Sequence, residues 1–292
     1  DISRKLGNYA SRTQYCEVIL NGDYIGLYVF QEKIKANANR VDVAKIEKTD
    51  NSLNNLTGGY ITKADRPDIN EPPTWVMEDT NFVHVLPKPE NATPEQTAYI
   101  KGEFDRFSDN LYNYDLENGY QTIIDVPSFV DFMLVNELSS NADAYQYSTF
   151  FHKDRGGKLR AGPIWDLNLS FGSSFTNSSD VDQWQFSNGN KTGPWFWAGL
   201  FDNRTFPCYF SRRWNEMIQP TKPMNLEVLT SFIDATLLYI SEAIPREHER
   251  WGTLANHTDD VANMKTFISE RIVWITNNIG PYSNCSNVEV PP

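Results

Sequence analysis

The stretch from Gly162 to Gly172 reads GPIWDLNLSFG, and it places Asp166 and Asn168 one residue apart inside a largely apolar run. A buried carboxylate is costly unless a cation, a metal ion or hydrogen-bond donors compensate it. The spacing therefore indicates either a hydrogen-bonded turn or a pair of ligands for a cation.

A predicted hairpin brings further oxygen-bearing side chains to this pair. YSTFFHKD and KLRAGPIWD read as two strands joined at Arg155-Gly156-Gly157. A turn about Gly156 places residue 148 opposite residue 164, and continuing the register places Asp143 near position 169. A helix predicted over 126–140 ends at the same place. We therefore expect four side chains to gather at the open end of the hairpin: Asp143, Ser148, Asp166 and Asn168.

Two carboxylates, an amide and a hydroxyl form a set of hard oxygen ligands. Such a set suits Mg²⁺, Mn²⁺ or Ca²⁺ rather than zinc or copper, and a divalent ion there could bridge to substrate phosphates. The alternative is that Asp143 stabilises a loop while Asp166 and Asn168 make structural hydrogen bonds. The spacing alone favours this alternative, because turns rich in Asp and Asn are common.

A second charged pair, Glu32-Lys33, follows the first predicted hairpin. By itself it is typical of a salt bridge at a strand edge. The sequence contains no G-x-x-x-x-G-K-[ST], no G-x-G-x-x-G and no G-x-S-x-G. It therefore lacks the common glycine-rich phosphate loops and the nucleophile elbow of hydrolases.

The pattern of elements predicts an α+β fold. A hairpin over 15–34 turns at Asn21-Gly22, and two further strands are predicted at 58–65 and 83–89. From Pro94 the apolar period is close to 3.6 residues, which predicts helices. They are expected from Pro94 onward, over 126–140 and at about 205–218, 225–243 and 258–279, with the second hairpin inserted and a Trp- and Ser-rich loop over roughly 173–204.

Size and composition predict one globular domain. The chain has 292 residues, 40% of them hydrophobic and 13% aromatic. We expect a single domain over 1–292, with a smaller β-rich lobe at 1–90 and a mainly helical lobe at 91–292 that carries the site. The formal net charge of −12 makes nucleic acids and anionic membrane surfaces poor partners, and no apolar run is long enough for a membrane span.

Cysteines and glycosylation triplets bear on localisation. Cys16, Cys208 and Cys285 allow at most one disulfide, and the sequence alone does not choose the pair. Eight N-x-[ST] triplets lean the prediction towards an exported, cell-surface, periplasmic or extracellular protein. The four histidines share no metal-ligand spacing, which indicates structural or surface roles.

Two motifs resemble those of the spore coat protein CotH family. NGDYIGLYVFQEKI is similar to the family's N-G-E-Y-x-G-x-Y-x-x-x-E. NADAYQYSTFFHKDRGGKLRAGPIWDLNLSFG is similar to N-x-D-x-Y…K-D…G-K-L…P-W-D-x-D-x-x-F-G. SFVDFMLVNELSSN and Arg213-Trp214 also fit, and the resemblance spans most of residues 5–280.

The resemblance implies an atypical protein kinase with a distorted kinase-like fold. It assigns Asp143 as the base that accepts a proton from a substrate hydroxyl, and Asp166 as the ligand that holds Mg²⁺ or Mn²⁺ against the phosphates of ATP. Asn168 and Ser148 would complete the metal ligands, and Glu32 and Lys33 would lie near the nucleotide. The implied reaction is phosphorylation of Ser or Thr on exported or surface proteins.

Departures from the family pattern predict weaker activity. Ser148 stands where a kinase catalytic loop has asparagine, and Asn168 replaces the last motif aspartate. The family's upstream segment, with basic residues expected to contact phosphates, would precede Asp1, so the smaller lobe is expected to be incomplete. The alternative function is a catalytically inactive surface module that binds a protein or glycan, for which the Trp-rich stretch 182–199 is the motivating feature.

Overall fold

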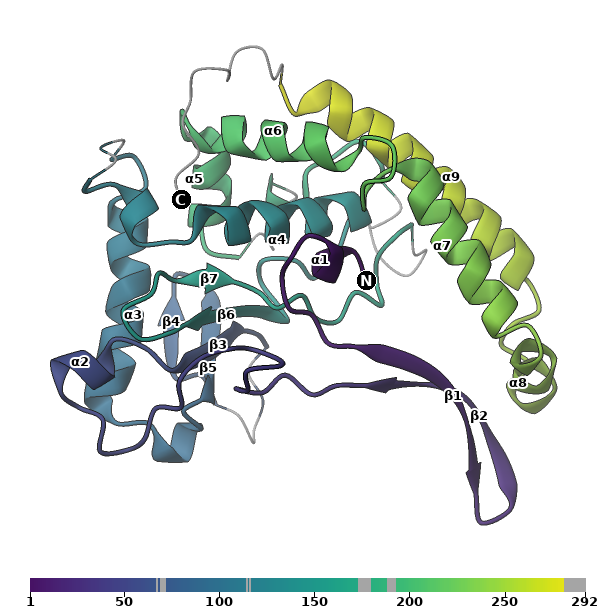
Figure 1. Cartoon of the computed structure of the whole chain (residues 1–292), viewed down its shortest axis with the longest axis horizontal. Coiled ribbons are helices and arrows are strands. Elements are labelled where there is room, and N and C mark those ends of the chain that lie inside the picture. Colours follow the sequence, from purple (N-terminus) through teal and green to yellow (C-terminus); the bar gives the residue numbers. More distant parts are fainter. Residues whose placement is uncertain are drawn as a thin grey trace.

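The computed structural model describes residues 1–280, except for 67, 69–71, 114, 116, 173–179 and 188–192. Its strands form a two-stranded hairpin and a five-stranded sheet, and helices pack above the sheet and beside the hairpin (Figure 1). Strands dominate the first 90 residues, and from Pro94 onward the chain is mainly helical with two short strands inserted. The predicted α+β class is therefore confirmed.

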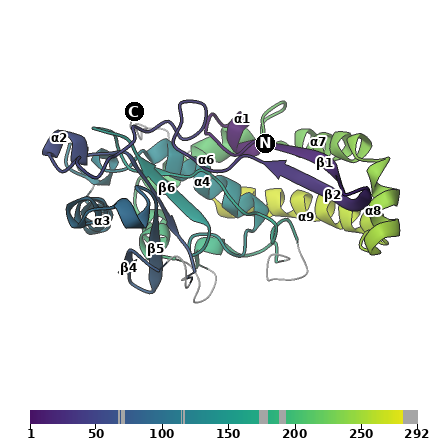
Figure 2. The same ribbon diagram turned by 90° about the horizontal axis from the view of Figure 1, so that it is seen from below.

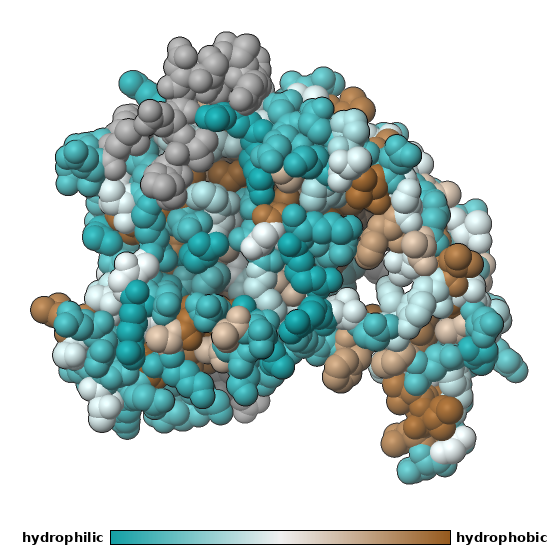
Figure 3. All heavy atoms as spheres, in the orientation of Figure 1, coloured by the Kyte–Doolittle hydropathy of each residue, from teal (hydrophilic) through white to brown (hydrophobic). Residues whose placement is uncertain are grey.

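The hairpin of β1 (Thr13–Leu20) and β2 (Asp23–Gln31) turns at Asn21-Gly22, as the sequence predicts. Both turn residues have positive φ, 53° and 89°, which suits Asn-Gly in a two-residue turn. The hairpin extends away from the sheet and lies beside α8 (Ala243–Trp251) in both ribbon views (Figures 1 and 2). Figure 3 shows apolar side chains gathered on it, and these include the exposed Ile19 and Phe30.

The five-stranded sheet has the order β4-β5-β3-β6-β7 and mixes strands from distant parts of the sequence. β3 (Tyr60–Ala64) is central, and it pairs antiparallel with β5 (Thr80–Leu86) and with β6 (Thr149–Lys153). β4 (Trp75–Met77) and β7 (Arg160–Ala161) form the edges. Four of the five side chains of β3 are buried, as expected for a strand covered on both faces.

The second hairpin has the predicted register. Phe151 pairs with Ala161 and His152 with Arg160, so residue 148 falls in line with residue 164 as expected. The predicted extension towards Asp143 is wrong as a strand pairing, because residues 142–146 form turns and β6 begins only at Thr149. The pairing of the two strands ends early because the chain turns away before β6 and after β7.

α4 (Val126–Ser139) is the central helix, and all but one of its residues are buried. The Asp125 carboxylate accepts a hydrogen bond from the Ser128 N–H, and Pro127 occupies the first turn, where its missing N–H costs nothing. α4 lies between the sheet and α6 (Phe206–Met217) (Figure 1). Arg213 of α6 donates to the buried Asp131 of α4 over 2.8 Å and joins the two helices.

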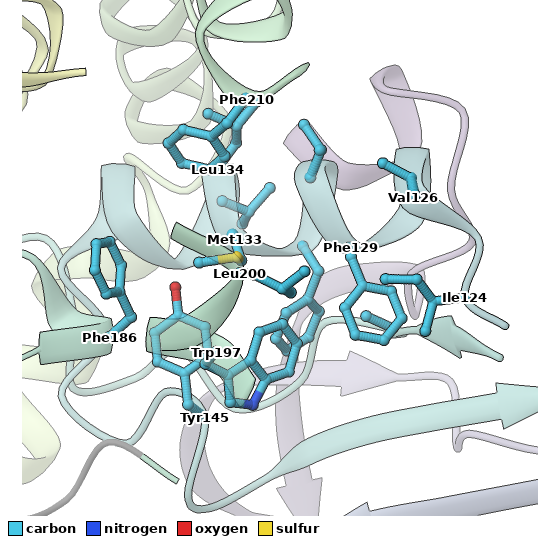
Figure 4. Close-up of a cluster of buried hydrophobic side chains, with 14 of the residues drawn as sticks. Ile124, Val126, Phe129, Met133, Leu134, Tyr145, Phe186, Trp197, Leu200 and Phe210 are labelled. Atoms are coloured by element: carbon cyan, nitrogen blue, oxygen red, sulfur yellow. The ribbon is translucent and has the colours of Figure 1, made fainter. Parts of the chain in front are cut away.

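Aromatic side chains from several elements fill the core under α4. Figure 4 shows Trp197 and Tyr145 turned towards Met133 and Phe129 of α4. The rings of Tyr145 and Trp197 are 4.9 Å apart, and both side chains are fully buried. The large aromatic content of the chain is therefore mostly core.

The remaining helices are α1 (Ile2–Lys5), α2 (Leu53–Leu56), α3 (Pro94–Asp109), α5 (Phe196–Asp202), α7 (Leu226–Tyr239) and α9 (His257–Asn278), and short 3₁₀ turns lie at Pro89–Asn91, Tyr120–Thr122 and Gln185–Ser187. α3 begins with the expected Thr93 cap and Pro94. Two expectations are corrected. The helix predicted at 225–243 ends at Tyr239, and part of the loop predicted at 173–204 forms α5, because the aromatic residues there pack into the core.

In the described chain, no helix by itself has the length and apolar character needed to cross a membrane. α7 and α8 meet that criterion only together, as a pair bent by 73°.

Candidate functional site

A tight turn after α4 carries Asp143 and Ser148. α4 ends at Ser140 in a left-handed conformation with φ 48°. The Asp143 N–H donates to the Asn141 side-chain oxygen over 3.3 Å, and the Tyr147 N–H donates to the Asp143 carbonyl over 3.0 Å. These bonds hold residues 141–148 in a compact loop whose last residue leads into β6.

The segment that carries Asp166 is held on both sides by the core. The ring of Trp165 packs edge-on against Phe150 of β6, with the ring centroids 6.2 Å apart. Further on, the Phe171 N–H donates to the Ser139 carbonyl of α4 over 2.6 Å. Between these anchors the exposed Asp166 accepts a hydrogen bond from the Ser148 hydroxyl over 3.4 Å. The two segments predicted to meet are therefore in contact through these two side chains.

Left-handed backbone is concentrated in these two segments. Positive φ values occur at five non-glycine residues between 140 and 171: Ser140, Tyr145, Ser148, Asp166 and Phe171. Such conformations are uncommon for residues with a side chain, and each carries a small energetic cost. Clusters of this kind occur where the surrounding structure fixes side chains for binding or catalysis, which supports a functional role for this region.

The Asp143 carboxylate is partly exposed and has a basic neighbour. An Arg66 guanidinium nitrogen lies 3.5 Å from the Asp143 Oδ1 atom. The same guanidinium stacks over the ring of Tyr147, 4.4 Å from its centroid. Trp195 and Trp197 do not cover this carboxylate: Trp195 stacks on Tyr112, and Trp197 is buried beneath the turn.

The other candidate residues are placed less closely. Asn168 is exposed, two residues beyond Asp166. Glu32 and Lys33 follow β2, and Lys33 is exposed.

A salt bridge between Glu32 and Lys33 does not form, because the Glu32 carboxylate pairs instead with Arg12 and Arg40. Hydrogen bonds from the Arg12 side chain and backbone lower the pKa of Glu32 to about 2.

An apolar groove of about 370 Å³ borders Asp166. Trp165 and Leu167 line it on either side of this aspartate, together with side chains of α7 and α9 and with Gln31, which precedes Glu32. A largely apolar hollow with a few polar groups at its edge has the character of a small-molecule site. The groove thus connects the Asp166 segment with the end of β2.

A buried ion pair supports the turn from below. Glu137 of α4 and Arg271 of α9 are both fully buried, 3.2 Å apart. The Glu137 carboxylate also accepts hydrogen bonds from the Tyr145 hydroxyl at 2.6 Å and from the N–H groups of Gln185 and Phe186. Tyr145 lies two residues from Asp143, so this network fixes the base of the turn to α4 and α9.

The donor set limits the kind of cation that fits. In the chain as described, no group of three or more His, Cys, Asp or Glu side chains could hold a metal ion. Asp166 supplies one carboxylate, with the Ser148 hydroxyl in contact and Asn168 close in sequence. This set fits an ion such as Mg²⁺, which binds one or two carboxylates and takes its other ligands from water and substrate phosphates.

Sequence reasoning missed Arg66 and the buried network. Arg66 lies in a polar loop after β3, far before Asp143 in the chain, and no local pattern links the two. Glu137 left a weak signal, since an acidic residue in the apolar run SFVDFMLVNELSSN needs a buried partner. The identity of that partner, Arg271, follows only from the packing of α9 on α4.

Comparison with known protein families identifies a family that this chain matches. The family described as CotH kinase protein matches residues 1–275, which is nearly the whole chain. No curated protein matches the sequence.

Proposed function

Since the chain belongs to the CotH kinase protein family, we propose that it is a protein kinase that transfers the γ-phosphoryl group of ATP to Ser or Thr hydroxyls of exported or surface proteins. Family membership implies ATP and a substrate to be phosphorylated. The observation that carries the proposal is the contact between Ser148 and Asp166 at the edge of an apolar groove, with Ser148 in the same compact loop as Asp143. This arrangement offers an apolar groove for the adenine ring of ATP, next to oxygen ligands for a metal ion bound to the phosphates.

The proposed roles follow from the chemistry of each side chain. Asp143 accepts the proton of the substrate hydroxyl. The hydroxyl oxygen bonds to the γ-phosphorus, and the bond between this phosphorus and the leaving oxygen of ADP breaks. Asp166, with Ser148 and Asn168, would hold Mg²⁺ or Mn²⁺, and the ion would supply positive charge to the phosphates. Glu32 and Lys33 directly follow Gln31, which lines the groove, and would contact the nucleotide from there.

The neutral ligands predict weak metal binding. Ser148 and Asn168 bring no negative charge, so Asp166 provides the charged ligand of the proposed set. Loss of ligand charge lowers cation affinity, and therefore we expect low affinity for Mg²⁺–ATP and slow turnover compared with a site that has two carboxylates.

An exported or cell-surface location is part of the proposal. Cys208 is disulfide-bonded, whereas Cys16 is a free thiol. Disulfides persist mainly in oxidising compartments outside the cytosol. Together with the glycosylation triplets, this supports localisation at the cell surface, in the periplasm or outside the cell.

The first test is a thermal-shift titration with Mg²⁺–ATP and Mn²⁺–ATP. Nucleotide at a hundred times its Kd should stabilise the wild-type chain by about 2.7 kcal/mol. Asp166→Ala should lose the metal-dependent shift, while Asp105→Ala, on the exposed face of α3, should keep it. Asp143→Asn should keep the shift and lose phosphoryl transfer to a protein substrate. Absence of any shift in the wild-type chain would contradict the proposal.

A second candidate function is a kinase-like module that binds a protein or glycan without catalysis. The ion pair between Arg66 and Asp143 favours it, because a cation beside the proposed base competes for the carboxylate. A wild-type chain that binds a surface ligand, but neither binds Mg²⁺–ATP nor transfers phosphate, would support this function instead.

A further inference from the structure

A guanidinium group lies at the proposed catalytic turn. Arg66 contacts the Asp143 carboxylate over 3.5 Å, and Asp143 is the residue proposed to accept the substrate proton. Positive charge near a reacting phosphoryl group stabilises the negative charge on its oxygens during transfer. The position of Arg66 therefore needs an explanation in terms of the reaction.

The backbone and an aromatic ring hold Arg66 at this position. It follows β3 directly after Asp65, whose carboxylate accepts the Arg66 N–H over 2.9 Å. Its guanidinium lies over the ring of Tyr147, and the Tyr147 N–H donates to the Asp143 carbonyl within the turn. Arginine stacked on an aromatic face stays orientated while its N–H groups remain free to bind anions at the edge.

The contact with Asp143 is suited to exchange. The Arg66 side chain is 66% exposed, whereas that of Asp143 is 24% exposed. Exposed ion pairs contribute little to stability, so replacing one carboxylate by another anion costs little. A guanidinium forms its strongest contacts with bidentate oxygen pairs of carboxylates and phosphates, and a nucleotide offers several such pairs.

The contacts also connect Arg66 to the proposed metal ligand. Tyr147, which carries the guanidinium, is followed by Ser148, and the Ser148 hydroxyl contacts Asp166. A phosphate chain bound through a metal at Asp166 would therefore lie against the same turn on which Arg66 rests.

We propose that Arg66 is a phosphate-binding catalytic residue, which releases the Asp143 carboxylate and contacts the phosphate oxygens of ATP when the nucleotide binds. This inference rests on the proposed kinase function. In the free protein Arg66 pairs with Asp143, and in the nucleotide complex Asp143 is free to accept the substrate proton. The alternative is a latch that only blocks Asp143, and this alternative predicts the opposite effect of removing the side chain.

The experiment compares Arg66→Ala, Arg66→Lys and the wild-type chain for binding of Mg²⁺–ATP and of adenosine, and for phosphoryl transfer. Loss of a charged contact to phosphate should lower ATP affinity roughly 10- to 100-fold. Adenosine, which lacks phosphates, should bind all three proteins equally. Arg66→Lys should retain part of the ATP affinity, and transfer should fall with Arg66→Ala. Arg246→Ala, which removes an exposed arginine paired with Glu17 on the distant hairpin, is the matched control and should leave both affinities unchanged.

The outcomes separate this inference from the function on which it rests. Equal ATP affinity in Arg66→Ala and wild type would overturn the role of Arg66 alone. Faster transfer by Arg66→Ala would also overturn it and would identify the latch. No ATP binding by the wild-type chain would overturn both proposals. Melting temperatures without ligand show whether each variant is folded, and we expect them to be unchanged for so exposed a side chain.

Discussion

Replacement of Glu137 by leucine should destabilise the protein more than any change to a surface ion pair. Glu137 is fully buried, and its carboxylate accepts hydrogen bonds from Arg271, Tyr145, Gln185 and Phe186. Leucine removes all four acceptor contacts and leaves the Arg271 charge buried without a counter-charge. Breaking a buried pair in this way costs about 3–5 kcal/mol.

The size of this effect can be compared with total stability. Domains of ordinary stability unfold with about 5–15 kcal/mol, so Glu137→Leu should leave the chain only marginally folded. Glu137→Gln keeps the volume and one acceptor oxygen, but it also removes the counter-charge of Arg271 and turns an amide NH₂ towards two donors, so we expect it to cost about 3 kcal/mol. Replacing Arg271 by leucine as well removes the unpaired charge. It also removes the hydrogen bonds that Arg271 donates to three backbone carbonyls, those of Glu137, Val181 and Gln183.

The assay is urea denaturation followed by tryptophan fluorescence, because Trp184 and Trp274 lie against Arg271 and report on its surroundings. The Arg271 substitution should cost at least about 1 kcal/mol less in the Glu137→Leu background than in the wild type. Glu17→Leu serves as control, since the Glu17 carboxylate receives two 2.7 Å bonds from Arg246 at the exposed hairpin and its loss should matter much less. Equal destabilisation by Glu137→Leu and Glu17→Leu would refute the argument.

Two further predictions concern close packing and pH. Gly58→Ala should destabilise the fold strongly, since an added Cβ would lie 2.0 Å from the Asp154 main chain. Gly102→Ala, in the middle of α3 where a Cβ meets no other atom, should raise the free energy of unfolding by up to about 1 kcal/mol. Chemical denaturation of both variants checks this. Burial lowers the pKa of His84 and of His152 from 6.5 to about 4. Both imidazoles are therefore neutral in the folded state, and as pH falls from 6.5 through 4 the unfolded chain binds protons first, so each site should remove about 3 kcal/mol of stability. A denaturation series from pH 7 to 4 that shows no loss attributable to these sites, with His84→Gln as comparison, would contradict this.

Local sequence signals determined most of the elements. Asn21-Gly22 specifies the first turn because both residues adopt positive φ at low cost, and the Thr93 cap with Pro94 specifies the start of α3. The Gly156 turn fixed the register of the second hairpin, because the pairing of two strands follows from the position of the turn between them. β4 was missed, since three residues next to a proline-rich loop carry too short a pattern to recognise.

The contact between Ser148 and Asp166 could also be predicted from the sequence. It depends on one hairpin, so counting from the turn brought these residues together. The prediction that the same register continues to Asp143 was wrong. Strand pairing holds only while the backbone stays extended, and turns and left-handed residues end it before β6 and after β7.

Only the tertiary structure decided which charges meet. Arg66 reaches Asp143, Arg271 reaches Glu137 over 134 positions, and Glu32 pairs with Arg12 and not with its neighbour Lys33. Periodicity shows which face of an element is buried, but it does not show which element packs against that face. Charged partners are set by that packing, and for this reason the proposed phosphate-binding arginine and the buried support of the turn became visible only in the folded chain.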